Sequence, residues 1–484
     1  MRRLRLPLFL LLAACLVLLG GCALVEETTP RAEVEPPTKA LLEETVGAEP
    51  TPTPPPATVE TPMLLCTPPL CTAEEVYYCP DECPGGCGTT CATPTPLPGG
   101  ASSAFVVAYV RDGNVWVVDD DAPLQLTTSG QDAEPRLSPD GEEVLFKRSV
   151  PPGPAGLERF ELRVVGTDGS GERLLVAPDD LPGEMGTPIE AEEEVMLDRL
   201  PWEISWLPVG GRAAFNTFLQ AGYGLSTNED LWLVDVETGV LSRLLADGEG
   251  GSFAFSPDAT ALLVSDPTTV SMLDADGTNR RELVTFDFVN TASEYAYIPQ
   301  PIWAPDGSYG LIAIQSAEPF GDDSTGSLWR LPREGEAALL NVLPGRFLFN
   351  TMLQNNLWSP DRSRFAYVSR DGQQLSIANG DGSGGEVYAV GDVEFRRWAP
   401  DSARFIYSAG QPPTFYIGEP GATPISLALS GDAGQVLSVR WVAPSRFVYS
   451  IGNFDSAAVL LGEIGRPHRT LATSTQGFDA TMLP

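Results

Sequence analysis

Histidine, the side chain that most often moves protons at neutral pH, occurs once in this chain of 484 residues, at His468. A Ser-His-Asp hydrolase would have to use this histidine and would usually carry its serine in a G-x-S-x-G turn. No such turn occurs, since Ser308 in GSYG and Ser450 in VYSIG lack the first glycine or its spacing. We therefore expect neither a serine hydrolase nor histidine-based metal catalysis, and we interpret His468 as a strand or turn residue.

Carboxylates are the abundant reactive groups, because 65 Asp and Glu face 30 Lys and Arg and give a formal net charge of −35. A pair of carboxylates could hydrolyse glycosides, but this abundance makes no single acid informative. Asp119–Asp121, and Asp274 with Asp276, superficially resemble calcium ligands, yet they fall where a tight hairpin turn favours Asp and Gly. We therefore expect no metal ion and no cofactor, and the charge argues against nucleic acid as a partner.

A third group of reactive side chains is a compact run of cysteines in residues 63–92, embedded in turn-forming Pro and Gly. In an exported chain such a run indicates disulfides, whose pairing the sequence does not decide. The alternative is a metal site in the C-x3-C-x3-C-x3-C run, although structural zinc sites usually use two separated pairs. The disulfide candidates are Cys66, Cys71, Cys79, Cys83, Cys87 and Cys91.

The N-terminal segment predicts export and lipidation. Residues 1–22 hold three arginines, an apolar run over residues 6–19 and then Gly-Gly-Cys, which is the layout of a signal peptide and resembles a lipoprotein lipobox. Cys22 would then carry the lipid, on the extracytoplasmic side of a bacterial membrane; an ordinary signal peptide cleaved elsewhere is the alternative. Residues 23–62 contain TPTPPPATVETP and predict a disordered linker, and residues 93–100 predict a second linker.

Residues 101–484 contain no cysteine and repeat one motif at a period of about 50 residues. Its clearest copy, NLWSPDRSRFAYVSR from Asn356, reads as a strand, a Ser-Pro-Asp turn and a second strand. The other copies are PRLSPDGEEVLF from Pro135, ISWLPVGGRAAF from Ile204, FAFSPDATALLV from Phe253, IWAPDGSYGLIA from Ile302, RWAPDSARFIYS from Arg397 and RWVAPSRFVYS from Arg440.

Most copies precede a second hairpin, so each unit predicts four short antiparallel strands. A sheet this small must stack on its neighbours, and closure into a β-propeller achieves this. Residues 104–130 supply three strands without a first one, and we expect the C-terminal strand near Thr481–Leu483 to complete that blade. The predicted fold is all-β: a propeller of eight blades, or seven if the last unit forms none, preceded by a stalk and the Cys-rich segment.

The S-P-D-G hairpin followed by an L-W-x-x-D strand resembles the WD40-like, or PD40, repeats of TolB-type propellers, which related peptidases share. The resemblance covers residues 101–484. It implies a propeller fold and says little about function, because propellers carry many activities.

Loop lengths in the predicted blades are asymmetric. Turns between the first and second and the third and fourth strands are tight, whereas several of the other connections are long and would share one face, where binding residues usually concentrate. We therefore predict a non-catalytic envelope lipoprotein that binds a protein or glycan through this face; the alternative is a carboxylate-based hydrolase or lyase at the propeller channel. The binding-face candidates are Glu190, Glu192, Glu193, Glu194, Tyr295, Tyr297, Phe347 and Phe349.

Overall fold

The chain forms two units, residues 1–102 and 103–484, in a computed structural model. The structure describes residues 76–78, 90–92 and 105–483, except 120–121, 154–155, 157, 187–193, 210, 220–225, 228, 294–295, 346, 348–356, 428–434 and 454–455. In the first unit, β1 (Val76–Tyr78) pairs antiparallel with β2 (Thr90–Ala92). Cys91 lies in β2, whereas Cys22 and the other disulfide candidates fall outside the described residues.

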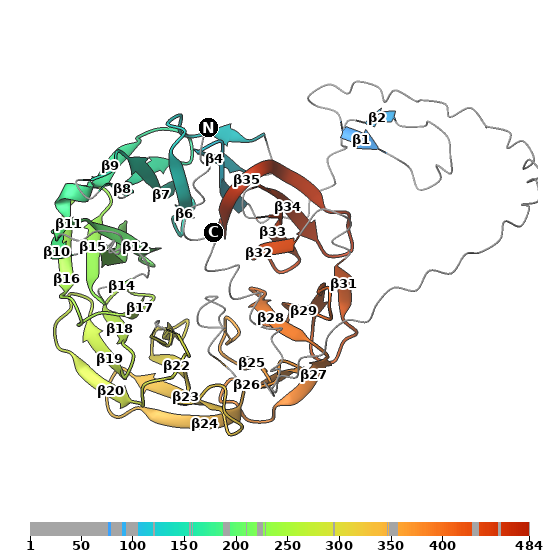
Figure 1. The fold of residues 1–484 in the computed structure, drawn as a ribbon. Helices are drawn as coiled ribbons and strands as arrows, with labels where there is room; N and C mark the ends of the chain where they lie inside the picture. Colours follow the sequence, from blue (N-terminus) through green and yellow to red (C-terminus); the bar gives the residue numbers. More distant parts are fainter. Residues whose placement is uncertain are drawn as a thin grey trace, which may run out of the picture. The chain divides into compact units, whose positions relative to one another are not determined.

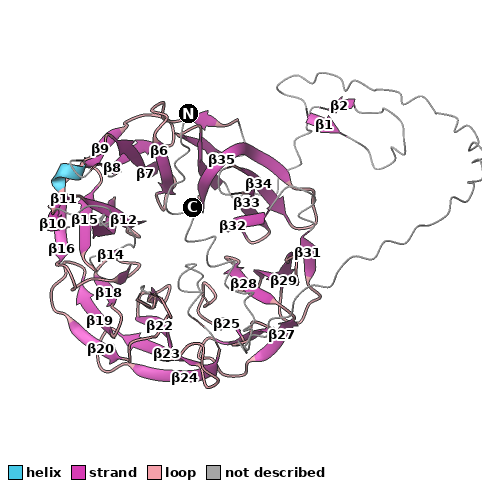
Figure 2. Ribbon diagram, viewed as in Figure 1, coloured by secondary structure: helices cyan, strands magenta, loops and turns pink. Residues whose placement is uncertain are grey.

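The described part of the second unit consists of antiparallel sheets built from strands that follow one another in the chain (Figure 1). Its one short helical turn is η2 (Pro178–Asp180), and strands dominate the rest (Figure 2). The first sheets are β6 (Asp132–Leu137), β7 (Glu143–Val150), β8 (Arg159–Gly166) and β9 (Arg173–Val176); β12 (Arg199–Trp206), β13 (Arg212–Leu219), β15 (Leu231–Asp235) and β16 (Leu241–Leu245), with β14 (Ser226–Thr227) beside β13; and β17 (Ser252–Phe255), β18 (Ala261–Ser265), β19 (Thr269–Asp274) and β20 (Arg281–Thr285).

The remaining sheets keep this pattern. They are β21 (Ile302–Trp303), β22 (Tyr309–Gln315), β23 (Thr325–Pro332) and β24 (Ala338–Pro344); β25 (Arg364–Val368), β26 (Gln374–Asn379) and β27 (Glu386–Val390); and β28 (Val393–Trp398), β29 (Phe405–Ala409), β30 (Thr414–Gly418) and β31 (Ile425–Leu427). A small hairpin, β10 (Glu184–Gly186) with β11 (Val195–Leu197), precedes β12. Figure 1 shows the first strand of each sheet towards a common centre and the last at the periphery, which is a β-propeller arrangement.

The two ends of this unit share one sheet, in the order β32 (Gln435–Ala443), β33 (Arg446–Gly452), β34 (Ala457–Glu463), β35 (Arg469–Met482), β3 (Phe105–Arg111), β4 (Asn114–Val118) and β5 (Leu124–Gln125). The first half of β35 pairs with β34, and its second half pairs with β3, where Thr481 lies opposite Val106. The predicted pairing of the C-terminal strand with the N-terminal strands is therefore confirmed.

Buried side chains join each sheet to the next. Leu145 and Val164 of one sheet pack with Phe215 and Val234 of the following one, and further clusters of the same kind link the later sheets. Phe478 of β35 belongs to a cluster that contains residues of β3, β33 and β34. Because each sheet is too small to bury both faces by itself, these shared clusters are its hydrophobic core.

The repeated motif has two recurrent sets of hydrogen bonds. In the turn, the Ser359 hydroxyl donates to Asp361 over 2.6 Å, and Asp361 accepts the Ser363 N–H over 3.0 Å, as the sequence predicts. Between sheets, an indole N–H donates to a carbonyl of the preceding sheet: Trp206 to Arg136 at 3.0 Å, Trp303 to Ala254 at 2.8 Å and Trp398 to Leu357 at 2.9 Å. Trp441, in the last copy, is buried, and its indole nitrogen has no partner among the described residues.

Among the described residues, no helix is long and apolar enough to cross a membrane. The predicted signal segment and the linkers at 23–62 and 93–100 lie outside them.

The Phe478→Ala variant tests the contribution of β35 to the fold. We expect it to lower the free energy of unfolding by about 3–5 kcal/mol, because it removes a ring from the cluster that unites β35 with β3. Urea unfolding followed by tryptophan fluorescence measures the change. The control, Gln476→Ala, alters an exposed residue of the same strand and should change stability by about 0.5 kcal/mol or less. Equal stability of the two variants would contradict a structural role for this pairing.

Candidate functional site

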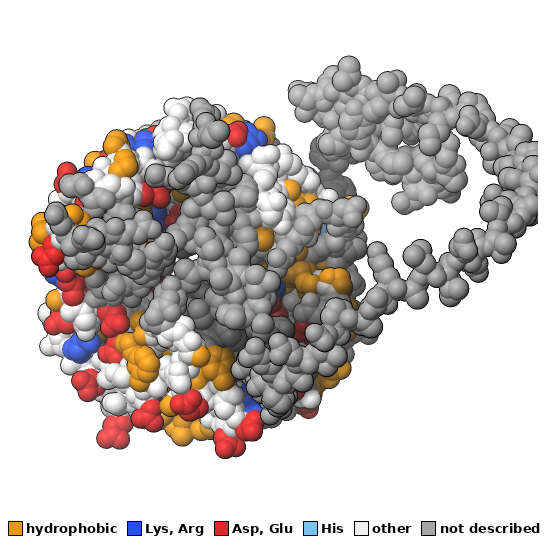
Figure 3. Space-filling view, in the orientation of Figure 1, with side chains coloured by type: hydrophobic (Ala, Val, Ile, Leu, Met, Phe, Trp, Pro, Cys, Tyr) orange, Lys and Arg blue, Asp and Glu red, His pale blue; other side chains and the backbone are white. Residues whose placement is uncertain are grey.

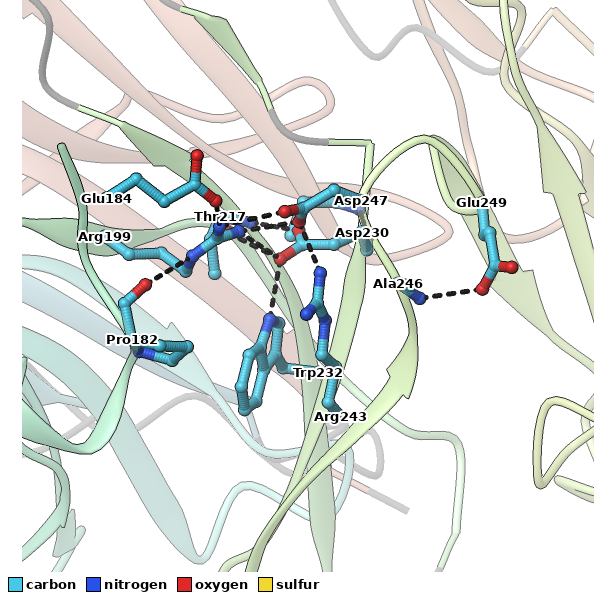
Figure 4. A network of polar contacts seen from close by, with 11 residues as sticks. Pro182, Glu184, Arg199, Thr217, Asp230, Trp232, Arg243, Ala246, Asp247 and Glu249 are labelled. Atoms are coloured by element: carbon cyan, nitrogen blue, oxygen red, sulfur yellow. Dashed lines mark hydrogen bonds and ion pairs between the residues drawn. The ribbon is translucent and has the colours of Figure 1, made fainter. Parts of the chain in front are cut away.

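Two groups of arginines are candidates for a functional site, and the first surrounds Arg199 at the start of β12 (Figure 4). The Arg199 side chain is 1% exposed, and its Nη atoms bond Asp247 at 2.7 and 3.0 Å and Asp230 at 3.2 Å. The other donors reach Glu184 Oε1 at 2.5 Å, Thr217 Oγ1 at 3.1 Å and the carbonyl of Pro182 at 3.0 Å. Arg199 thus fastens the β10–β11 hairpin to the sheet of β12.

This network is complete within the protein. Burial by itself would lower the pKa of Arg199, but the hydrogen bonds and charge of Asp247, with the charges of Asp230 and Glu184, raise it. The Asp230 carboxylate also accepts the indole N–H of Trp232 at 2.6 Å and the Thr217 hydroxyl at 2.6 Å. Since the guanidinium already has partners on every side, we interpret the network as structural.

The second group consists of Arg136, Arg397 and Arg440, which we call the inner arginines. They lie on β6, β28 and β32, the first strands of their sheets, and each stands directly before the apolar residue of its motif copy that is buried between sheets. The strands β28, β32, the second half of β35 and β6 are neighbours in that order. The inner arginines therefore line one side of the centre of the unit.

The inner arginines have few anionic partners. Arg440 Nε lies 3.9 Å from Asp479 Oδ1 on β35, while the other oxygen of Asp479 accepts the Leu137 N–H at 3.0 Å. The Arg136 side chain donates to the carbonyl of Pro135 at 3.2 Å, and in the described part of the chain the side chain of Arg397 makes no hydrogen bond or ion pair. Arg397 and Arg440 thus share the single carboxylate of Asp479.

The excess of positive charge is reflected in the pKa values of Arg397 and Arg440. Burial and the charge of Arg440 lower the pKa of Arg397 to about 9, against the opposing effect of Asp479. Burial also lowers the pKa of Arg440, and the charge of Arg136 adds to this effect. The arginines remain charged at neutral pH, and Arg440 is 30% exposed, so an incoming anion could reach it. Guanidinium groups in this state favour a carboxylate or phosphate, which matches their forked donors.

A carboxyl group with a perturbed pKa adjoins the inner arginines. Surrounding protein atoms partly desolvate the Glu203 carboxyl on β12 and raise its pKa, although the residue as a whole is solvent-exposed. The charges of Arg136 and Lys147 oppose this rise. Lys147 itself is buried, bonds Glu134 at 2.9 Å and lies over the rings of Phe160 and Trp202. Lys147 therefore has protein partners, and Glu203 lies near Lys147 and one of the inner arginines, Arg136.

The structure describes three of the predicted binding-face residues, of which one is exposed and two are buried. Glu194 is exposed, just before β11, but Tyr297 and Phe347 are 3% and 1% exposed and so offer no rings to a partner. The Tyr297 hydroxyl donates to the carbonyl of Ala313, and the Phe347 ring covers Gly326, where an added Cβ would lie 1.8 Å away. The candidates Glu190, Glu192, Glu193, Tyr295 and Phe349 lie outside the described residues.

The sequence analysis missed the inner arginines, although a signal was present. Three copies of the motif carry Arg directly before the apolar residue, whereas the copies at Phe253, Ile302 and Leu357 carry Ala, Ile or Leu there. A charged residue at a position where three other copies are apolar and the copy at Ile204 has Ser205 indicates a role besides packing. Figure 3 shows acidic side chains spread around the periphery of this face.

The comparisons with known proteins are distant. No family model and no curated protein match the chain, so its resemblance to TolB-type repeats stays a prediction. Among solved structures, it is similar to a eukaryotic initiation factor (10% identity, 78% of this chain and 98% of that one, TM-score 0.48). It is also similar to an oligogalacturonate lyase from Vibrio parahaemolyticus (13% identity, 63% of this chain and 83% of that one, TM-score 0.40). A third similar structure is dipeptidyl peptidase 4 from Porphyromonas gingivalis (10% identity, 76% of this chain and 57% of that one, TM-score 0.49). Similarities this low assign no activity.

The Arg199→Met variant tests the structural interpretation of the first network. We expect it to lower the free energy of unfolding by about 3–5 kcal/mol, because it leaves the fully buried Asp230 carboxylate without its cation. The control, Arg243→Met, removes a 33% exposed partner of Asp247 and should cost about 1 kcal/mol or less. Urea unfolding at neutral pH compares the two, and a small loss in Arg199→Met would contradict the interpretation.

Proposed function

We propose that the protein is an exported, lipid-anchored β-propeller that binds a carboxylate-bearing ligand through the inner arginines. The observation that supports this most is Arg397, a guanidinium that forms no ion pair among the described residues and lies near a second arginine and the carboxylate of Asp479. Placing like charges together is unfavourable unless an anion offsets them. In a chain whose formal charge is −35, such a site is not explained by overall composition.

We further propose that the propeller is a closed ring of eight blades. Support comes from the pairing of β35 with β3 and from the buried clusters, which join β3 and β4 to the sheet of β6 on one side and to β33 and β34 on the other. Lipidation at Cys22 and disulfides in residues 63–92 complete the proposal, which would hold the ligand site outside the cell.

The Arg397→Gln variant tests ligand binding. In the full chain with Cys22→Ser, we expect acidic oligosaccharides or acidic peptides to bind, and Arg397→Gln to weaken this binding about tenfold or more, because a hydrogen bond to a charged group contributes about 1.5–3 kcal/mol. Isothermal titration with oligogalacturonates in one arm and poly-Glu peptides in the other distinguishes glycan from protein ligands.

The matched control is Arg330→Gln, which removes the same charge from an exposed residue of β23, the third strand of its sheet. Affinity should be unchanged in this control. The proposal would be contradicted if the protein with its native arginines bound neither the oligogalacturonates nor the poly-Glu peptides. It would also be contradicted if Arg397→Gln and Arg330→Gln lowered the affinity equally.

The second candidate function is catalysis by Glu203, favoured by its raised pKa beside Arg136. A carboxyl group that keeps its proton to higher pH can act as a general acid, and the inner arginines would orient an acidic substrate. If this is correct, incubation with oligogalacturonates should release shorter products, and Glu203→Gln should abolish the release while leaving affinity within about twofold. Chromatography of the products is the measurement, and intact oligosaccharides after prolonged incubation would exclude this function.

A further inference from the structure

A cavity of about 600 Å³ lies between the sheet of β28–β31 and the strands β33 and β34 of the next sheet. Its volume falls in the range of small-molecule sites, about 300–1,000 Å³. Apolar side chains form most of its wall, and the only histidine of the chain, His468, lies in the turn that closes one end. The apolar residues that line it are Ile417, Ile425, Leu427, Ile451, Leu460 and Ile464.

The polar groups of the wall are a hydrogen-bonded pair and an ion pair. The Tyr449 hydroxyl lies 2.5 Å from His468 Nδ1, and the His468 ring packs edge-on against Phe447. Arg466 Nε lies 3.2 Å from Glu463 Oε1 at the outer edge. Because this ion pair is neutral as a unit, the cavity holds no unpaired charge that would favour an ionic ligand.

The direction of the Tyr449–His468 hydrogen bond depends on which ring nitrogen carries the imidazole proton. Burial raises the pKa of Tyr449 to about 12, so the phenol keeps its proton and can donate it to Nδ1 when the imidazole proton is on Nε2. Burial lowers the pKa of His468, which favours the neutral imidazole. A neutral imidazole that accepts at Nδ1 carries its proton on Nε2, and in the described residues this N–H has no hydrogen-bond partner.

We propose that His468 carries its proton on Nε2 and that this cavity binds a small, neutral molecule with an apolar aromatic or aliphatic body and one acceptor group that accepts a hydrogen bond from this N–H. The apolar wall supplies most of the binding energy, and Tyr449 is a positioning residue that fixes which nitrogen donates. The site lies on outer strands and shares no residue with the inner arginines, so it does not depend on the function proposed above.

The fluorescent probe N-phenyl-1-naphthylamine measures occupation of the cavity in the full chain with Cys22→Ser. We expect saturable binding with one site per chain, at least tenfold weaker in Ile425→Trp, because Ile425 lines the cavity, is 47% exposed and can be enlarged without disturbing the core. The control is Val390→Trp, on the outer strand of the preceding sheet, where the residue is 70% exposed and outside the cavity. This control should bind normally.

Competition by two related compounds tests the role of His468. We expect 2-acetylnaphthalene, which has a carbonyl acceptor, to displace the probe at least fivefold more effectively than naphthalene. The His468→Phe variant should lose this preference, whereas His468→Gln, which keeps a donor, should retain part of it. The C2–H proton resonance of the single histidine should shift on binding.

Three results would overturn the proposal: normal probe binding by Ile425→Trp, no preference for the acetyl compound, or an unshifted histidine resonance at saturation. The last two use the native side chains, so they decide the question even if a variant fails to fold. Arg397→Gln should bind the probe normally, which separates this site from the anion site.

Discussion

The rest of this unit depends on one constraint: the apolar faces of each sheet must be buried against neighbouring sheets. A sheet of four short strands has two apolar faces and no core of its own, so every sheet needs a neighbour on each side. The shared clusters meet this need with ordinary hydrophobic packing, and the indole of Trp206, Trp303 or Trp398 adds a hydrogen bond to the sheet before it. Positions that differ between copies of the motif are not needed for this packing, so they can hold residues that bind ligands.

The two arginine groups show how context determines the role of one residue type. Arg199 and Arg397 both stand on the first strand of a sheet, but Arg199 has carboxylates on β10, beside β15 and after β16. Arg397 faces Arg440 from the adjacent sheet instead. The guanidinium of Arg199, whose hydrogen bonds are all made within the protein, holds a hairpin in place. The guanidinium of Arg397, which forms no ion pair among the described residues, can bind a ligand.

Local sequence predicted the repeated frame well, because the chemistry of the Ser359–Asp361 turn depends on residues within five positions of one another. It also predicted the pairing of β35 with β3. It could not predict which arginine is paired, since partners such as Asp230 and Asp247 are remote in sequence. Aromatic residues in long connections were expected at the surface, yet Tyr297 and Phe347 are buried, because a ring that can cover a sheet edge or a glycine loses contact with water.

The missing hydrogen bond of Trp441 has a structural consequence. Its indole stands where the corresponding tryptophans tie one sheet to the previous one, and here the tie is absent among the described residues. The border between β28–β31 and β32–β35 therefore relies on apolar packing, with no indole hydrogen bond from Trp441 among the described residues. Arg397 lies on one side of this border and Arg440 on the other. An anion bound by both guanidiniums, as proposed above, would add a polar contact between the two sheets at this border.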